Sequence, residues 1–179
     1  LRLLCHEGEF QPLLGELVLH KLDAVLSDRP APPNPALKTT SQLLGTSALA
    51  WYAPAPWAAA ARQNFPLSLA QVPLLLPTEH AAVRARINHW LEREHIRPHI
   101  AGEFEDSALL STFAASGMGV MPAPASLGAH LAQTCALEWV GTTPDVHEQF
   151  HLIYSARKVM HPLLMRLLAA AADEMLLNE

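Results

Sequence analysis

The stretch Gly102–Pro122, GEFEDSALLSTFAASGMGVMP, indicates the fold class most clearly. It opens with an extended run that leads to an acidic turn. Asp106 suits the start of a helix there, because a short carboxylate accepts from the unpaired N–H groups of the first turn. Apolar residues then recur at helical spacing over Leu109–Ala114, and Gly117 suits the end of that helix. A short apolar run follows, and we expect its proline to end the second strand.

The rest of the chain repeats this alternation of strands and helices, which predicts an α/β protein with a mostly parallel sheet. Asp23–Ser27 alternates too little for a half-exposed strand, which favours a central parallel position. Thr78 is expected to cap the helix that follows it. The other expected strands are residues 1–4, Ser47–Tyr52, Val72–Leu76, 97–104, Leu137–Val140 and Phe150–Tyr154. The other expected helices are Phe10–Lys21, Ala125–Gln133 and a last one from His161–Pro162, while Ala53–Arg62 is either a short helix or a connector.

Composition fits one globular domain or two small lobes. The chain has 179 residues, half of them hydrophobic, and a net charge of −5 with no basic stripe, so it should not bind nucleic acid by itself. Cys5 and Cys135 lie far apart, which favours a reduced cytosolic setting and leaves one disulfide open. No apolar run reaches membrane length, and no signal peptide opens the chain. The chain starts inside an apparent strand before His6–Gly8, so we interpret it as a fragment.

Catalytic and metal-binding motifs are missing from the sequence. It has no GxSxG and no phosphate loop, and Gly117–Gly119 follows a helix, so an enzyme or a cofactor is not expected. His147 and His151 approach a strand, where positions four apart lie ~13 Å apart at ~3.3 Å per residue. His95 and His99 span a proline that would break a helix. These spacings do not favour a zinc site.

Several of these stretches, in their order and spacing, resemble a known family. Leu109–Pro122 resembles the late βαβ unit in the effector domains of LysR-type transcriptional regulators. HKLDAVLSD at His20–Asp28 resembles their earlier helix-to-strand junction. Together with Asn88–Leu91 and Gly102–Asp106, that junction is similar to the sodium-responsive antiporter regulators of the NhaR type. The resemblance extends over nearly the whole chain.

This resemblance implies a type II periplasmic-binding-protein-like fold, with two Rossmann-like lobes joined by two crossover strands. The crossings would be Ser47–Tyr52 and Phe150–Ser155. Lobe I would comprise residues 1–48 and 154–179, and lobe II residues 49–153. An amino-terminal winged helix-turn-helix, a linker helix, and the first strand and helix of the effector domain would be missing from this chain.

The resemblance also implies a cytoplasmic effector-sensing domain that works as a homodimer or tetramer and reaches DNA only through the missing domain. Its effector, a small molecule or Na⁺, would lie between the lobes, and the regulated gene would encode a Na⁺/H⁺ antiporter. The matching positions are Glu7, Gly8 and Phe10 in the first lobe, and Thr78, Glu79, His80, Phe104, Glu105 and Asp106 in the second. Carboxylates and hydroxyls suit a hard cation, whereas nearby helix N-termini favour anions. Capping and solvation would also explain each of these residues taken singly.

Two alternatives stay open at this point. A solute-binding protein would share the fold and carry a small molecule for transport, and it would have a signal peptide or a lipoprotein cysteine upstream. An assembly module with an empty cleft would tolerate a change such as Thr78→Ala, whereas changes at its interface would abolish signalling.

Overall fold

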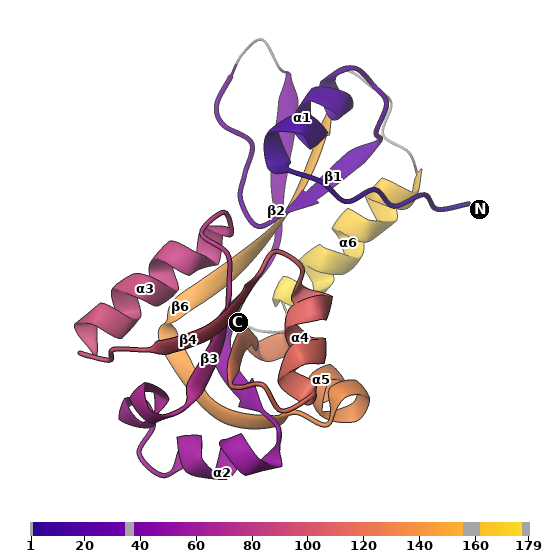
Figure 1. Cartoon of the computed structure of the whole chain (residues 1–179). Helices are drawn as coiled ribbons and strands as arrows, with labels where there is room; N and C mark the ends of the chain where they lie inside the picture. The colour runs from indigo at the N-terminus through magenta and orange to yellow at the C-terminus, as the bar shows by residue number, and fades with distance from the viewer. Residues whose placement is uncertain (1, 35–37, 156–161, 177–179) are drawn as a thin grey trace. The chain divides into compact units, whose positions relative to one another are not determined.

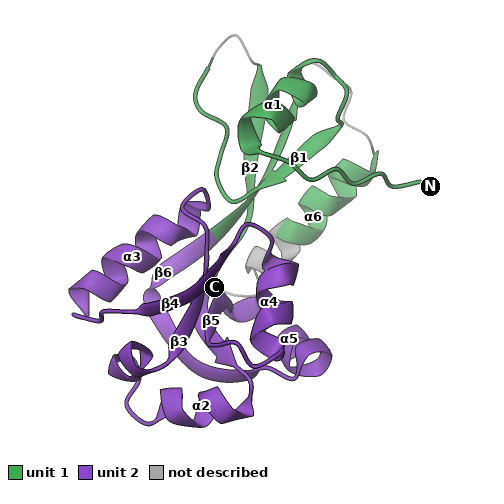
Figure 2. Cartoon of the chain, in the orientation of Figure 1, with its two compact units in different colours: residues 1–46, 149–179 green, residues 47–148 purple. Residues whose placement is uncertain are grey.

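The computed structural model of the chain describes residues 2–34, 38–155 and 162–176. The chain forms two compact units, unit 1 with residues 1–46 and 149–179, and unit 2 with residues 47–148 (Figure 2). Strands β2 (Thr39–Ala53) and β6 (Glu138–Ser155), labelled in Figure 1, each contain residues of both units.

Unit 1 is built around a small antiparallel strand pair. β1 pairs with the end of β6, with Val25 opposite Ile153. Helix α1 buries Leu14 and Leu17 against these two residues, because the two leucines lie three positions apart and share one helical face. Besides its parts of β2 and β6, the unit contains α1 (Phe10–Val18), β1 (Ala24–Ser27) and α6 (Pro162–Leu176).

Two sequence-based expectations for unit 1 are wrong. Residues 2–9 form no strand and are exposed, because leucines alone do not make a strand unless a neighbouring strand pairs with them. β1 is neither parallel nor central in the described sheet, whose order is β1-β6-β2-β5, and its Leu26 is 66% exposed. β1 is antiparallel because it pairs with β6. A local apolar run in the sequence does not show which strand will be its partner. The last helix starts at Pro162, and His161 lies outside the described residues.

Unit 2 contains the parallel part of the fold. β3 pairs in parallel with β4, and Val120 bridges Leu74 in parallel, whereas β5 pairs antiparallel with β2. The expected mostly parallel sheet is therefore wrong: β3 and β4 form a separate two-stranded parallel sheet, while β1 with β6 and β2 with β5 pair antiparallel in the four-stranded sheet. The elements are α2 (Ala55–Arg62), η1 (Leu67–Gln71), β3 (Pro73–Pro77), α3 (Ala82–Arg93), β4 (His99–Phe104), α4 (Ser107–Ala115), β5 (Met121–Pro124), η2 (Ala125–Leu127) and α5 (Gly128–Cys135).

The acidic turn and the helix after it fold as predicted. The Asp106 carboxylate accepts from the backbone N–H groups of Ala108 (2.6 Å) and Leu109 (3.0 Å), and so caps α4. Gly117 follows α4 with a φ of +96°, which glycine adopts at little cost. β5 continues past Pro122, which was expected to end it. Antiparallel pairing with β2 keeps β5 extended to Pro124, with Trp51 opposite Pro122 and Leu49 opposite Pro124.

Thr78 does not cap α3. The helix begins at Ala82, and its cap residue Ala81 makes no side-chain capping bond. The Thr78 backbone N–H donates instead to the Phe104 carbonyl (3.0 Å), and its carbonyl accepts from Ala81 N–H (3.1 Å). Thr78 thus extends the β3–β4 pairing and closes a turn before the helix can start.

Two strands are longer than the local apolar runs in the sequence predicted. Ser47–Tyr52 lies within β2, and the two strands expected at Leu137–Val140 and Phe150–Tyr154 form parts of one 18-residue strand, β6. The polar residues between those two apolar runs give no strand signal, although their pairing keeps them extended. The Ala53–Arg62 segment forms a helix, α2.

Both faces of β3 are buried. Leu74 and Leu76 pack into a cluster with Trp51, Ile87 and other residues, while Leu75 packs into a second cluster on the opposite face. This alternation explains why β3 is a continuous apolar run, since a strand covered on both faces needs no polar side. The residues that follow β3 are therefore attached to a strand that is packed on both faces.

Candidate functional site

Most of the predicted second-lobe residues follow the carboxyl ends of β3 and β4. The register places Pro77 opposite Phe104, and the hydrogen bond from Thr78 N–H to Phe104 O extends the pair by one residue. Glu79 follows Thr78, and Glu105 follows Phe104, so these side chains leave neighbouring strand ends. In open α/β sheets, ligands bind at this edge. We call these residues, Thr78–His80 and Glu103–Asp106, the strand-end group.

A buried arginine from α3 connects the two sides of the strand-end group. Arg84 is 3% exposed. Its Nη1 donates to Pro77 O (2.5 Å) and to Glu103 Oε1 (2.6 Å), and its Nη2 lies 3.1 Å from Glu79 Oε1. Its Nε donates to Asn88 Oδ1 (3.0 Å). One side chain therefore contacts both strand ends and the turn.

The sequence reasoning missed Arg84. A signal was present, because Arg84 shares a helical face with Ile87 and Leu91, three and seven positions further on. A charged residue on an apolar face must find partners within the fold. Glu79 and Glu103 provide them while their own side chains stay 66% and 47% exposed, so the carboxylates keep part of their hydration.

The other members of the strand-end group differ in their surroundings. The Asp106 carboxylate is engaged as the cap of α4. The Phe104 ring is half-buried and lies 5.1 Å from the Phe113 ring, between centroids. Glu105 and His80 are exposed. The group thus offers exposed oxygen atoms beside an aromatic surface.

The predicted first-lobe residues lie together at the start of α1 in unit 1. Glu7 and Gly8 are exposed in the irregular segment before the helix, and Phe10 is its first residue. The Arg29 guanidinium lies 5.6 Å from the centroid of the Phe10 ring, a cation–π distance. These residues belong to unit 1 and the strand-end group belongs to unit 2. A site shared by both groups remains a prediction.

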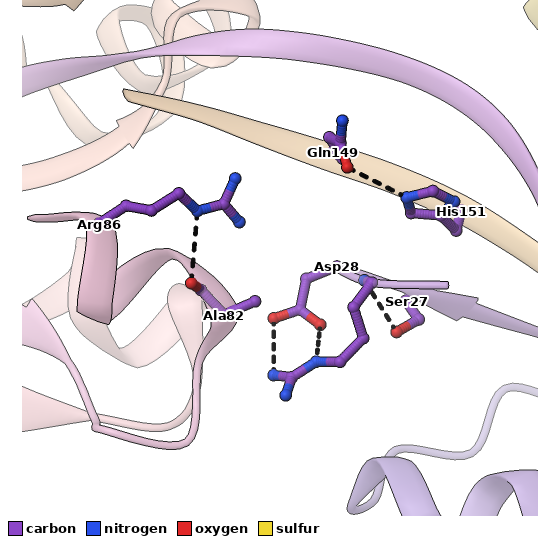
Figure 3. A network of polar contacts seen from close by, with 7 residues as sticks. Ser27, Asp28, Ala82, Arg86, Gln149 and His151 are labelled. Carbon is purple, nitrogen blue, oxygen red and sulfur yellow. Dashed lines mark hydrogen bonds and ion pairs between the residues drawn. The ribbon is translucent and has the colours of Figure 1, made fainter. Parts of the chain in front are cut away.

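Unit 1 also contains polar contacts that the sequence reasoning missed. Arg29 binds the Asp28 carboxylate through Nε (2.8 Å) and Nη2 (3.1 Å), and this hydrogen bonding raises the pKa of Arg29. His151, on β6, is 8% exposed, and its Nε2 lies 3.4 Å from Gln149 Oε1 (Figure 3). Its Nδ1 has no hydrogen-bond partner among the described residues.

A pocket of about 610 Å³ lies elsewhere in unit 2, and none of the predicted site residues lines it. Its walls are mostly apolar. The lining residues are Tyr52, Ala125, Gly128, Ala132, Ala136, Leu137, Glu138 and Trp139. Within the described part of the chain, no group of three or more His, Cys, Asp or Glu side chains could hold a metal ion. Both cysteines are free thiols. None of the described helices has the length and apolar character to cross a membrane.

Comparison with known families gives the classification of this fold. Residues 1–176 match the LysR substrate binding domain family. The chain belongs to this family. The match confirms the α/β type II periplasmic-binding-protein-like fold for this domain. It also confirms that the chain is not an enzyme, because these regulatory domains are non-enzymatic.

Two curated relatives illustrate the range of similarity. The chain is 26% identical over 167 residues to the transcriptional activator protein NhaR of Escherichia coli K12, covering 93% of this chain and 54% of NhaR. It is 30% identical over 113 residues to the nitrogen assimilation regulatory protein nac of the same organism, covering 62% of this chain and 35% of nac. The chain therefore spans about half the length of NhaR and less of nac.

Solved structures share the fold at lower identity. The cofactor-binding domain of the Cbl transcriptional regulator superposes with a TM-score of 0.68 at 18% identity, covering 90% of this chain and 70% of that chain. The effector-binding domain of QuiR in complex with shikimate gives 0.58 at 15% identity, covering 93% and 76%. The PA01 protein of Pseudomonas aeruginosa gives a TM-score of 0.69 at 14% identity, covering 95% of this chain and 59% of that chain.

Proposed function

We propose that this chain is the effector-sensing domain of a LysR-type transcriptional activator that responds to sodium or alkali stress and controls a Na⁺/H⁺ antiporter gene. The similarity to NhaR along 93% of the chain supports this specificity. The family match favours a regulator over a solute-binding protein of the same fold. The proposed location is the cytoplasm.

The charge of the strand-end group is the observation that carries the sodium part of the proposal. It has four carboxylates, and one buried guanidinium, from Arg84, lies against it. An excess of carboxylate oxygen favours a hard cation over an anion. The proposed effector-binding residues are Thr78, Glu79, His80, Phe104, Glu105 and Asp106, together with Glu7, Gly8 and Phe10 of unit 1.

The proposed mechanism is a shift between conformational populations. The effector binds one conformation of the domain better than another, and this difference in affinity sets how far the equilibrium can move. In a homodimer or tetramer the shift would reposition DNA-binding domains that lie outside this chain. No chemical step is involved, so the response depends on binding free energy alone.

Thermal unfolding of the full-length protein in NaCl and in KCl at equal ionic strength tests sodium binding. A selective ligand stabilises the folded state, by about 2.7 kcal/mol at a hundred times its Kd, so we expect a higher Tm in NaCl. Glu105→Gln should reduce this difference, while Glu92→Gln, an exposed change on α3, should leave it intact. Equal Tm values in both salts would contradict direct sodium binding. Glu7→Gln in the same assay tests the contribution of unit 1.

Chromatin immunoprecipitation of the full-length protein tests the regulatory role separately. We expect enrichment at an antiporter gene, changing when cells are moved from potassium to sodium medium. Enrichment at other genes, or enrichment that does not change with sodium, would support a role in transcription regulation but contradict the proposed sodium specificity. Complete absence of enriched DNA sites would contradict the regulator and favour the solute-binding alternative.

A further inference from the structure

Arg84 has an unusual set of partners for a helical arginine. Its guanidinium contacts a strand-end carbonyl, Pro77 O, and carboxylates from the turn after β3 and from β4, Glu79 and Glu103. Asn88, one helical turn further along α3, accepts from Nε and also donates to Glu79 Oε1 (3.4 Å). The arginine is thus a shared centre for both sides of the strand-end group.

The turn that carries Thr78 and Glu79 is joined to β4 and to α3 by backbone and side-chain hydrogen bonds. In its backbone, Thr78 N–H donates to Phe104 O, Ala81 N–H donates to Thr78 O, and Arg84 N–H donates to Ala81 O (3.1 Å). The cap residue of α3, Ala81, makes no side-chain capping bond, because an alanine methyl group cannot accept a hydrogen bond. Arg84 adds a side-chain connection to both Glu79 and Glu103, because its rigid fork of donors can satisfy several acceptors.

We propose that Arg84 is a positioning residue for effector binding, which holds the turn after β3 against the end of β4 without touching the effector. This inference rests on the proposed function of the strand-end group. Without the guanidinium, Glu79 and Glu103 would lose their shared partner and repel each other, so the turn would leave its position. A lysine at this site would keep the charge, but its single ammonium could not reach all four acceptors.

Hydrogen–deuterium exchange of the full-length protein tests the positioning role directly. In Arg84→Met we expect exchange of peptides over residues 77–82 to rise by about tenfold, since local opening controls exchange there. Arg84→Lys should give a smaller rise. Arg93→Met is the matched control, because Arg93 lies on the same helix and also binds two carboxylates, Glu94 and Asp145, but is 47% exposed. It should leave residues 77–82 unchanged.

A second pair of variants covers the case in which Arg84→Met does not fold. Glu79→Gln and Glu103→Gln remove one charged partner each from exposed positions, and we expect each to raise exchange in the same segment. Unchanged exchange at residues 77–82 in all variants would overturn the proposal. An even rise across β3 and β5 would also overturn it, since it would show a purely structural role in the core.

The comparison of NaCl with KCl separates this inference from the proposed function. If the unmodified protein has a sodium-specific rise in Tm, Arg84→Met should reduce that rise, and a full sodium response in the variant would overturn the positioning role. If the unmodified protein has no such rise, the sodium proposal fails, while the exchange measurements still decide whether Arg84 positions the turn.

Discussion

At the scale of single residues, unit 2 buries two large polar side chains, those of Arg84 and Tyr52. Arg84 is buried among acceptors, and Tyr52 is 2% exposed with its hydroxyl donating to Ala125 O at 3.4 Å. Burial raises the pKa of Tyr52 above its ordinary value, because the phenolate would lose hydration. Both effects depend on neighbours that are distant in sequence.

Tyr52 should make the protein sensitive to alkaline pH. A raised folded-state pKa means that its stabilising contribution is complete below the unfolded pKa of about 10 and is lost as pH rises through the folded value. We expect urea midpoints to fall above about pH 10, and to fall less in Tyr52→Phe. Tyr154→Phe, which changes the other tyrosine of the chain, is the control. Equal alkaline losses in Tyr52→Phe and the unmodified protein would contradict this prediction.

Gly119 permits a close contact between two backbone segments. A Cβ at this position would lie against the Pro73 carbonyl of β3, 3.0 Å from its carbon, and Val120 N–H donates to that same carbonyl at 2.8 Å. Gly119→Ala should therefore destabilise the protein by about 1–3 kcal/mol in urea unfolding, since the backbone must shift. Gly15→Ala, on α1 with nothing near its Cβ position, should be neutral or stabilising. A neutral Gly119→Ala would disprove the close approach.

At the scale of elements, the strand–turn–helix from β4 to α4 depends on local chemistry. α4 is only nine residues long, and its first N–H groups need an acceptor. Asp106 provides it, while the Phe104 and Phe113 rings pack across the turn. Capping and packing together fix where the acidic turn ends and the helix begins.

The cap of α4 can be tested by two substitutions. Asp106→Ala should lower the free energy of unfolding by about 1 kcal/mol, because two N–H groups lose their acceptor. Asp106→Asn should retain most of the stability, since an amide oxygen accepts equally well. Urea denaturation followed by circular dichroism measures both. Equal losses for alanine and asparagine would show that the carboxylate charge, and not the cap, is what stabilises the helix.

At the scale of the whole molecule, acidic residues outnumber basic ones. The chain has 12 Lys and Arg against 17 Asp and Glu, a net charge of −5. Neutralising phosphates requires clustered cations, and the sequence offers no basic stripe. We therefore expect that this chain does not bind duplex DNA by itself.

An electrophoretic mobility assay checks this expectation. The purified chain should not shift duplex DNA at about 0.15 M salt, since non-specific affinity depends on released counterions. The full-length protein serves as the positive control for the same DNA. A shift by this chain alone, weakening steeply with added salt, would contradict this expectation.

The sequence by itself determined the local features of this protein and its family. Apolar spacing predicted the helices α1, α3 and α4. Asp106 indicated the cap of α4, and Gly117 indicated the turn after α4. Each of these features depends on residues that are close together in the chain. The order of the motifs was enough to place the chain in the LysR fold. These features need no knowledge of distant partners.

Only the tertiary structure decided which segments pair and which charges meet. β1 is antiparallel because of β6, more than 120 residues further along the chain, and β6 stays extended through polar residues because its neighbours pair with it. Thr78 does not cap α3, and its backbone N–H donates to the Phe104 carbonyl instead. Arg84 contacts both Glu103 and Glu79 of the strand-end group. These positions depend on strand pairing and burial between residues that are distant in sequence. Such contacts produce no local periodicity of apolar residues from which they could be predicted.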